Sequence, residues 1–256
     1  MTCPSTPQAN FSATVDFNGA SAVVALVRLS GEPALAERVR ALLPPYARDR
    51  PADTPGQRER LEAGAALITL SAWAVGAAPE PDAWGRTDAG APVPPPGLPH
   101  VSLSHTRGLA AVALARVPVG VDVERARLGR DLDRVARASF APEEHAWWRT
   151  TPAPARAGAF LRAWTVKEAV LKAAGLGLAG GLEHVVTDAR GALTALPPGL
   201  GEAGGWSVAP LDTRDDETAA ALALWHGRAE GAGAEGGRRD GDGVRVVHVT
   251  IAEALG

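Results

Sequence analysis

The order of secondary-structure elements that the hydrophobic pattern predicts begins a second time near Pro118. Before that residue, apolar runs and helical periodicity predict strands at 22–29, 100–105 and 109–115 and helices at 32–43 and 57–75. After it, they predict a strand at 119–124, helices at 131–140, 142–149 and 159–174, and strands at 183–187, 205–209, 219–225 and 244–251. Because the two halves share an order of elements but no sequence repeat, we expect an α+β fold of two similar α/β subdomains.

Changes in composition divide the chain into three parts. We expect an N-terminal extension at 1–21, a first subdomain at 22–118 and a second subdomain at 119–256. A tract rich in glycine, arginine and acidic residues occupies 227–243, between the last two predicted strands, and it cannot bury enough apolar surface to order itself. The sequence therefore predicts a disordered hairpin loop there.

Composition argues against several classes of protein. The 256-residue chain contains one cysteine, Cys3, which excludes a disulfide framework and a cysteine zinc site. Its first residues lack the basic and apolar regions of a signal peptide, and no apolar run approaches the ~18 residues of a membrane span. The net charge of −3 argues against general nucleic-acid binding. We expect a cytoplasmic protein without a membrane or nucleic-acid partner. Five arginines between Arg125 and Arg137 form either a local basic face or an ordinary solvated helix face.

Only two lysines occur in the chain, Lys167 and Lys172, whereas 24 of its 26 basic residues are arginine. Lysine is a compact point charge that suits phosphate oxygens. One interpretation is that the two lysines have no special role and simply remain in a chain whose composition is biased toward arginine. Because both lie on one predicted helix with Glu168 between them, the sequence favours a phosphate-binding site.

Three carboxylates have the pattern of a magnesium site. Asp122 and Glu124 alternate with valines on a predicted strand, so both carboxylates project to the same side. Mg²⁺ prefers such oxygen ligands together with phosphate oxygens. Glu168 offers a third carboxylate, because the row Phe160, Trp164, Glu168 and Lys172 shares one helix face. The alternatives are a polar outer strand face for the first pair and a surface salt bridge between Glu168 and Lys172.

Polar residues in the first half could contact phosphate. Ser104 and His105 end a predicted strand and can donate hydrogen bonds, but neighbours on a strand point to opposite faces, which argues against a catalytic dyad. Arg60 opens the long predicted helix and could also serve a phosphate, as an alternative to being an ordinary surface arginine.

Taken together, these residues resemble the 4′-phosphopantetheinyl transferases of the long, surfactin-synthetase-activator (Sfp) type. The segment 101–106 (VSLSHT) is similar to the family's N-x-SHS motif, 120–124 (GVDVE) to G-[IV]-D-[IVL]-E, and 164–172 (WTVKEAVLK) to W-[ST]-x-K-E-x-x-x-K. The order and spacing of the three motifs carry the resemblance, which covers roughly residues 22 to 190. It implies a pseudo-twofold duplicated fold with the active site between two subdomains of one chain, and hence a monomer.

The resemblance also implies an activity and a role for each matched residue. The expected activity is the Mg²⁺-dependent transfer of 4′-phosphopantetheine from coenzyme A to a serine of an apo acyl- or peptidyl-carrier protein, with release of 3′,5′-ADP. The matched residues fall into three roles: Asp122, Glu124 and Glu168 as ligands of Mg²⁺; Glu168 and Lys172 as catalytic residues; and Arg60, Ser104, His105, Lys167 and Lys172 as contacts of coenzyme A.

Two positions depart from the family pattern. The family's G-K-P loop corresponds to Gly90-Ala91-Pro92, so its coenzyme-binding lysine is absent, and Arg86 is a candidate substitute. Ser102 stands where the N-x-SHS motif has asparagine. Neither departure removes a predicted metal ligand, so both concern the affinity for coenzyme A.

Two rival functions fit parts of the pattern. A different Mg²⁺-dependent phosphoryl or nucleotidyl transferase would use the same carboxylates with another donor, and an inactive relative would bind carrier proteins without chemistry. The composition suggests a GC-rich genome, in which such enzymes often serve polyketide or nonribosomal peptide synthases.

Overall fold

The computed structural model describes residues 20–126, 131–177, 181–227 and 243–255. The chain forms two compact units. The first unit comprises residues 1–116 together with 240–256, and the second unit comprises residues 117–239. Most of the expected extension at 1–21 and of the loop at 227–243 lies outside the described residues.

A four-stranded sheet forms the centre of the first unit. Its strands lie in the order β11 (Val244–Thr250), β1 (Ala22–Arg28), β5 (Leu109–Ala115) and β4 (His100–Thr106). β1 pairs in parallel with β11 and antiparallel with β5, and β5 pairs antiparallel with β4. β1 lies between two neighbours and is apolar up to Val27, with buried residues on both of its faces, as the continuous run of valine, alanine and leucine predicts.

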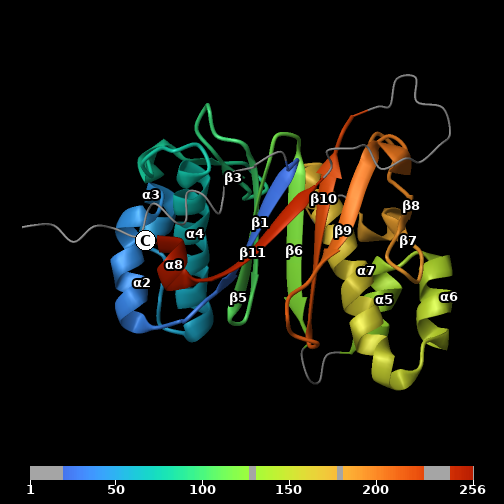
Figure 1. Cartoon of the computed structure of the whole chain (residues 1–256). Coiled ribbons are helices and arrows are strands. Elements are labelled where there is room, and N and C mark those ends of the chain that lie inside the picture. The colour runs from blue at the N-terminus through green and yellow to red at the C-terminus, as the bar shows by residue number, and fades with distance from the viewer. Residues whose placement is uncertain (1–19, 127–130, 178–180, 228–242, 256) are drawn as a thin grey trace, which may run out of the picture. The chain divides into compact units, whose positions relative to one another are not determined.

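Helices cover one face of this sheet, and short elements complete the first unit (Figure 1). The helices are α2 (Pro33–Val39), α3 (Pro45–Arg48), α4 (Pro55–Trp73) and α8 (Ile251–Leu255), and the short elements are the 3₁₀ turns 40–42 and 81–83 and the strands β2 (Gly85–Arg86) and β3 (Pro92–Val93). A capping box between Thr54 and Gln57 starts α4. The buried carboxylate of Glu62 accepts hydrogen bonds from the amide and hydroxyl of Ser30, which ties α4 to the end of β1.

The second unit places one long helix across a three-stranded antiparallel sheet. The sheet has the order β6 (Val119–Arg125), β10 (Thr218–Trp225) and β9 (Trp206–Leu211). Its helix α7 (Ala153–Ala173) packs against β6 and β10, with α5 (Leu132–Ser139) and α6 (Pro142–Thr150) beyond it (Figure 1). The short elements are the 3₁₀ turns 182–184 and 203–205 and the hairpin of β7 (Val186–Thr187) and β8 (Leu193–Ala195).

The mixed helix and sheet architecture that we predicted from the sequence is confirmed, but its division along the chain is corrected. The second subdomain was expected to run to residue 256. Instead, β11 pairs with β1 over seven residues, and Ile251 and Ala254 of α8 are buried in the core of the first unit. The predicted hairpin between 219–225 and 244–251 is therefore wrong, because β10 pairs with β6 and β9. None of the described helices is long and apolar enough to cross a membrane.

Candidate functional site

A glycine brings β6 and α7 of the second unit into close contact. A Cβ atom at Gly120 would overlap the carbonyl oxygen of Ala169 and lie 2.6 Å from the backbone nitrogen of Ala173. No side chain larger than hydrogen fits this approach of strand to helix. Side chains alternate along a strand, so Asp122 and Glu124 share the face of Gly120, which lies against α7. The sequence predicts the shared face but not its contact with the helix.

Lys172 on α7 meets Asp122 on β6. Its ammonium group lies 2.7 Å from Oδ1 of Asp122 and donates a second hydrogen bond, of 3.1 Å, to the carbonyl of Val121. Asp122 is 4% exposed, whereas the side chain of Lys172 is 27% exposed. The pair thus places a partly accessible cation beside a buried carboxylate, which is the arrangement expected for a residue that also binds an anionic ligand.

Glu168 lies in the electric field of the same residues. Burial, together with the nearby carboxylates of Asp122 and Glu124, raises its pKa from 4.5 to about 7, against the opposing effect of the Lys172 ammonium. Charged groups that shift a pKa in this way must lie close to the carboxyl that titrates. The fold therefore brings Asp122, Glu124 and Lys172 near Glu168. The rival interpretation of Glu168 and Lys172 as an ordinary surface ion pair does not explain this crowding.

The donor atoms at this place are those that Mg²⁺ prefers. All three side chains offer carboxylate oxygens, and their mutual repulsion would be relieved by a divalent cation. In the described part of the chain, no three His, Cys, Asp or Glu side chains converge closely enough to enclose a metal ion as they stand. The assignment of Asp122, Glu124 and Glu168 as metal ligands therefore stays a prediction.

The structure places Lys167, an expected contact of coenzyme A, in a buried ion pair. The side chain of Lys167 has no exposed surface, and its ammonium lies 2.5 Å from Oε2 of the equally buried Glu144. It also donates to the carbonyl oxygens of Leu182 and Val185, at 2.9 and 2.5 Å. Burial lowers the pKa of Lys167, and the hydrogen bond that its ammonium donates to Glu144 opposes this effect. The two motif lysines thus have different surroundings, which their shared motif does not reveal.

The predicted phosphate contacts of the first unit lie on β4 and α4. Ser104 and His105 are neighbours on β4, opposite Ala111 and Ala110 of β5, so their side chains point to opposite faces of the sheet. Ser104 is buried, His105 is half-buried, and Arg60 is exposed on the second turn of α4. Their roles as coenzyme contacts remain predictions.

In the structure, Arg60 lies in a group with Arg50 and Arg86. The sequence motifs did not predict this group. Arg86 and Arg60 both add to burial in lowering the pKa of Arg50, so both guanidinium groups lie close enough to that of Arg50 to repel it. Arg86 lies over the ring of Tyr46, 5.9 Å from its centroid, and donates to the carbonyl of Gly90 at 2.8 Å. It is therefore held beside the loop that lacks the family's lysine. Three cations in one place attract anions.

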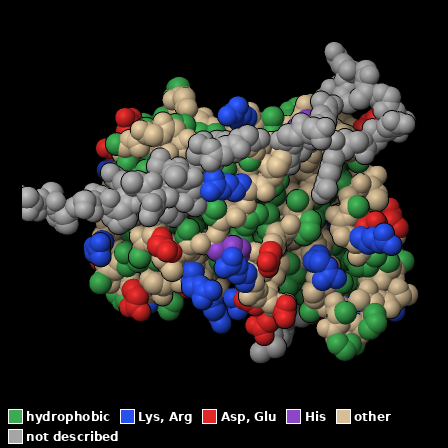
Figure 2. Space-filling view, in the orientation of Figure 1, with side chains coloured by type: hydrophobic (Ala, Val, Ile, Leu, Met, Phe, Trp, Pro, Cys, Tyr) green, Lys and Arg blue, Asp and Glu red, His purple; other side chains and the backbone are tan. Residues whose placement is uncertain are grey.

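Three of the five arginines from Arg125 to Arg137 lie in the described part of the chain, so the predicted basic face stays a prediction. Arg127 and Arg130 lie outside the described residues. Arg125 is ion-paired with Asp215, and Arg134 and Arg137 are exposed on α5. Figure 2 shows basic and acidic side chains interspersed on the face in view.

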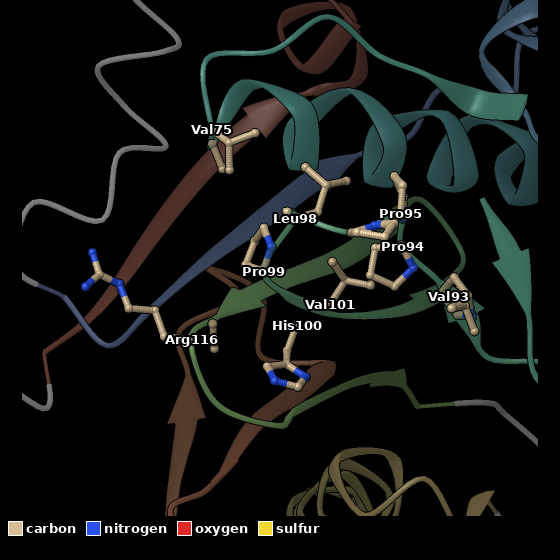
Figure 3. Close-up of a pocket in the computed structure, with 14 residues that line it drawn as sticks. Val75, Val93, Pro94, Pro95, Leu98, Pro99, His100, Val101 and Arg116 are labelled. Carbon is tan, nitrogen blue, oxygen red and sulfur yellow. The ribbon is translucent and has the colours of Figure 1, made fainter. Parts of the chain in front are cut away.

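A pocket of about 790 Å³ in the first unit is formed by other residues. It lies between the end of α4, the proline-rich segment 92–99 and the adjoining ends of β4 and β5, with Leu98 and Val101 among its apolar walls and His100 and Arg116 beside them (Figure 3). None of the residues predicted for catalysis, metal binding or coenzyme binding lines it.

Comparison with known proteins connects the second unit to one family. Residues 118–225 match the family profile of the 4′-phosphopantetheinyl transferase superfamily. The chain is 38% identical over 125 residues to the 4′-phosphopantetheinyl transferase HetI of Nostoc sp., which covers 48% of this chain and 50% of HetI. It is 30% identical over 80 residues to the 4′-phosphopantetheinyl transferase gsp of Aneurinibacillus migulanus, which covers 31% of this chain and 32% of gsp.

The aligned parts thus span half the length, or less, of these curated relatives. The matched segment 118–225 contains β6 and α7, and with them Asp122, Glu168 and Lys172. Through this segment, the resemblance of the chain to the 4′-phosphopantetheinyl transferases that its sequence motifs indicate is confirmed.

Proposed function

We propose that this chain transfers the 4′-phosphopantetheine group of coenzyme A to a serine of an apo acyl- or peptidyl-carrier protein and releases 3′,5′-ADP. The observation that supports this most strongly is the meeting of Asp122, Glu168 and Lys172 inside the segment that matches the transferase superfamily. The proposal includes a duplicated fold and a cytoplasmic monomer without nucleic-acid or membrane partners. The proposed substrates are the carrier proteins of polyketide or nonribosomal peptide synthases.

The proposed reaction exchanges the phosphoanhydride bond of coenzyme A for a phosphoester bond to the carrier serine. The oxygen of the carrier serine attacks the phosphorus that bears pantetheine, and the bond from that phosphorus to the oxygen of 3′,5′-ADP breaks. Phosphoryl transfer of this kind depends mainly on positioning and on neutralisation of charge. Lys172, whose ammonium is partly exposed beside Asp122, contacts the pyrophosphate oxygens in this proposal.

Glu168 is the candidate acceptor of the serine proton. Without a metal its pKa is about 7, within the favourable range for a general base, and a bound Mg²⁺ would lower that pKa. Asp122, Glu124 and Glu168 would hold Mg²⁺, which when bound supplies charge neutralisation at the pyrophosphate. The arginine cluster of Arg50, Arg60 and Arg86 is a candidate anion site in the first unit.

Mass spectrometry of an apo carrier domain tests the proposal directly. After incubation with this protein, coenzyme A and Mg²⁺, we expect the carrier to gain the mass of one phosphopantetheine and 3′,5′-ADP to appear, with no gain when the metal is chelated. Glu168→Gln should lower the rate at least ~100-fold, since it removes a proton acceptor and a ligand. Glu202→Gln, which changes an exposed acid of the second unit, is the matched control and should keep the wild-type rate.

Other outcomes would select a rival function. Binding of coenzyme A without modification of several unrelated carriers would indicate an inactive carrier-binding relative. A phosphorylated or nucleotidylated product without 3′,5′-ADP would indicate another phosphoryl donor. A Glu168→Gln variant with normal turnover would contradict the assigned role of this residue.

A further inference from the structure

The side chains of Lys167 and Glu144 connect three segments of the second unit at a point closed to solvent. Lys167 extends from α7 and Glu144 from the first turn of α6, and their further partners lie in residues 182–187. A lysine ammonium has three hydrogens to donate. Lys167 donates its three hydrogens to the carboxylate of Glu144 and to the carbonyl oxygens of Leu182 and Val185, so no donor remains for a ligand.

The carboxylate of Glu144 is also fully used. Its Oε2 accepts from the backbone amide of Ala141 at 2.8 Å and from Lys167, and its Oε1 accepts from the amide and hydroxyl of Thr187 at 2.8 and 2.9 Å. A buried ion pair contributes little net stability compared with apolar packing, but it holds its partners in one specific arrangement when every donor and acceptor is matched. This pair therefore fixes where α7 lies relative to α6 and to residues 182–187.

The pair also determines the direction in which Glu168 points. Successive residues of an α-helix are about 100° apart around the axis, so a fixed Lys167 sets the direction of the next side chain. Side-chain tips lie ~5–6 Å from the axis, so a rotation of about 10° moves them by ~1 Å. A displacement of this size at a reacting group can cost about 100-fold in rate.

We propose that Lys167 and Glu144 are positioning residues, whose buried pair fixes the rotation of α7 so that the Glu168 carboxylate stays directed toward Asp122 and Glu124. Lys167 thus acts through its neighbour and makes no contact with coenzyme A. The inference rests on the proposed transfer reaction and assigns the first lysine of the W-T-V-K-E segment its part in it.

Lys167→Met tests the inference, because methionine has a similar length but removes the charge and all three donors. We expect kcat to fall about 100-fold while the KM for coenzyme A stays within about threefold, since the residue touches no coenzyme. Binding of Mn²⁺, used as a paramagnetic probe of the three carboxylates and followed by electron paramagnetic resonance, should weaken about 10- to 100-fold. Circular dichroism at the assay temperature gives the folded fraction, to which all values are referred.

The control is Leu211→Ala, which removes a buried side chain of β9 without touching α7's ion pair. We expect it to lower the midpoint of unfolding while leaving kcat and Mn²⁺ affinity per folded molecule unchanged. If Lys167→Met behaves in the same way, the pair only stabilises the fold and the inference is wrong. A raised KM for coenzyme A with unchanged Mn²⁺ binding would instead make Lys167 a coenzyme contact and would also overturn it.

A change of the partner residue covers the case in which Lys167→Met does not fold. Glu144→Gln keeps the shape of the side chain and an oxygen for Thr187, but it removes the charge and puts an amide donor where Oε2 accepts from Ala141 and Lys167; the same readings apply to it. If the wild-type chain modifies no carrier although Mn²⁺ binding still weakens in both variants, the positioning role stands and the proposed reaction fails.

Discussion

Lys167 and Lys172 lie on the same helix but meet opposite environments. Five residues along a helix turn a side chain by about 140°, so the two ammonium groups leave α7 on different sides. Lys167 is enclosed with Glu144, whereas Lys172 lies at the partly open edge beside Asp122. The sequence shows two lysines suited to phosphate, but it cannot show which one is buried, because Glu144 is 23 positions away and has the pattern of an ordinary helix start.

The raised pKa of Glu168 predicts a dependence of stability on pH. Its folded pKa of about 7 exceeds the ordinary value of 4.5, so the folded state binds the proton more tightly than the unfolded chain. The stabilising contribution of the protonated form is complete below pH ~4.5 and is lost as the pH rises to about 7. The shift corresponds to roughly 3 kcal/mol, which exposure to solvent reduces to about 1–2 kcal/mol.

Glu168→Gln should remove this dependence. We expect the metal-free variant to be more stable than the wild type by about 1–2 kcal/mol at pH 8 and to gain nothing at pH 4, as measured by urea unfolding in the presence of a chelator. Addition of Mg²⁺ at pH 8 should stabilise the wild type and not the variant. An equal difference between the two proteins at both pH values would show that the Glu168 carboxylate does not titrate in this way.

At the scale of elements, the contact between β6 and α7 sets the separation of the proposed catalytic groups. Gly120→Ala places a methyl group on the backbone of Ala169 and Ala173, so helix and strand must move apart. We expect a loss of at least about 1–3 kcal/mol in the free energy of unfolding, together with a fall in transfer rate greater than the loss of folded protein explains. The measurement combines urea unfolding with kinetics corrected for the folded fraction.

Gly204→Ala is the matched control, because a Cβ atom at that glycine meets nothing within 4 Å and its backbone has no left-handed conformation. It should leave stability and rate near those of the wild type. If Gly120→Ala behaved like Gly204→Ala, the close approach of β6 and α7 would have no bearing on the site.

Sequence periodicity predicted most elements because it reports which face of an element is buried. It placed β1, β4, β5 and β6 within one residue of their observed ends. It placed the start of α7 six residues late, at Ala159 instead of Ala153, because the first turns carry prolines and arginine, and burial begins only at Ala159. Likewise, motif spacing drew attention to Asp122, Glu168 and Lys172. The cluster of Arg50, Arg60 and Arg86 was not predicted, because its members lie on a loop, a helix and a hairpin, and no local sequence pattern connects residues so far apart.

At the scale of the whole molecule, the chain returns to its first unit at its C-terminal end. The strand pattern of 244–250 predicts β11 but does not name its partner, because alternation of side chains reports burial and not pairing. A hairpin with the preceding strand was the shortest connection, yet β11 instead pairs in parallel with β1, more than 200 residues earlier. The first unit therefore contains strands from both ends of the chain, and its stability should depend on residues after 240.

Hydrogen exchange can test this dependence strand by strand. Ile251 is 4% exposed in the core of the first unit, so Ile251→Ala should cost about 2–5 kcal/mol through the lost contacts and the remaining cavity. The amides of β1 and β5 should then exchange faster, whereas those of β6 and β10 should keep their protection, because each unit has its own core.

Val170→Ala, in the core cluster of α7, should give the reverse pattern. Faster exchange at β6 and β10 with unchanged protection at β1 would be expected there. If Ile251→Ala instead loosened β6 and β10 while leaving β1 protected, the C-terminal residues would support the second unit, as the sequence alone suggested. If both variants loosened all four strands equally, the two units would unfold as one cooperative body.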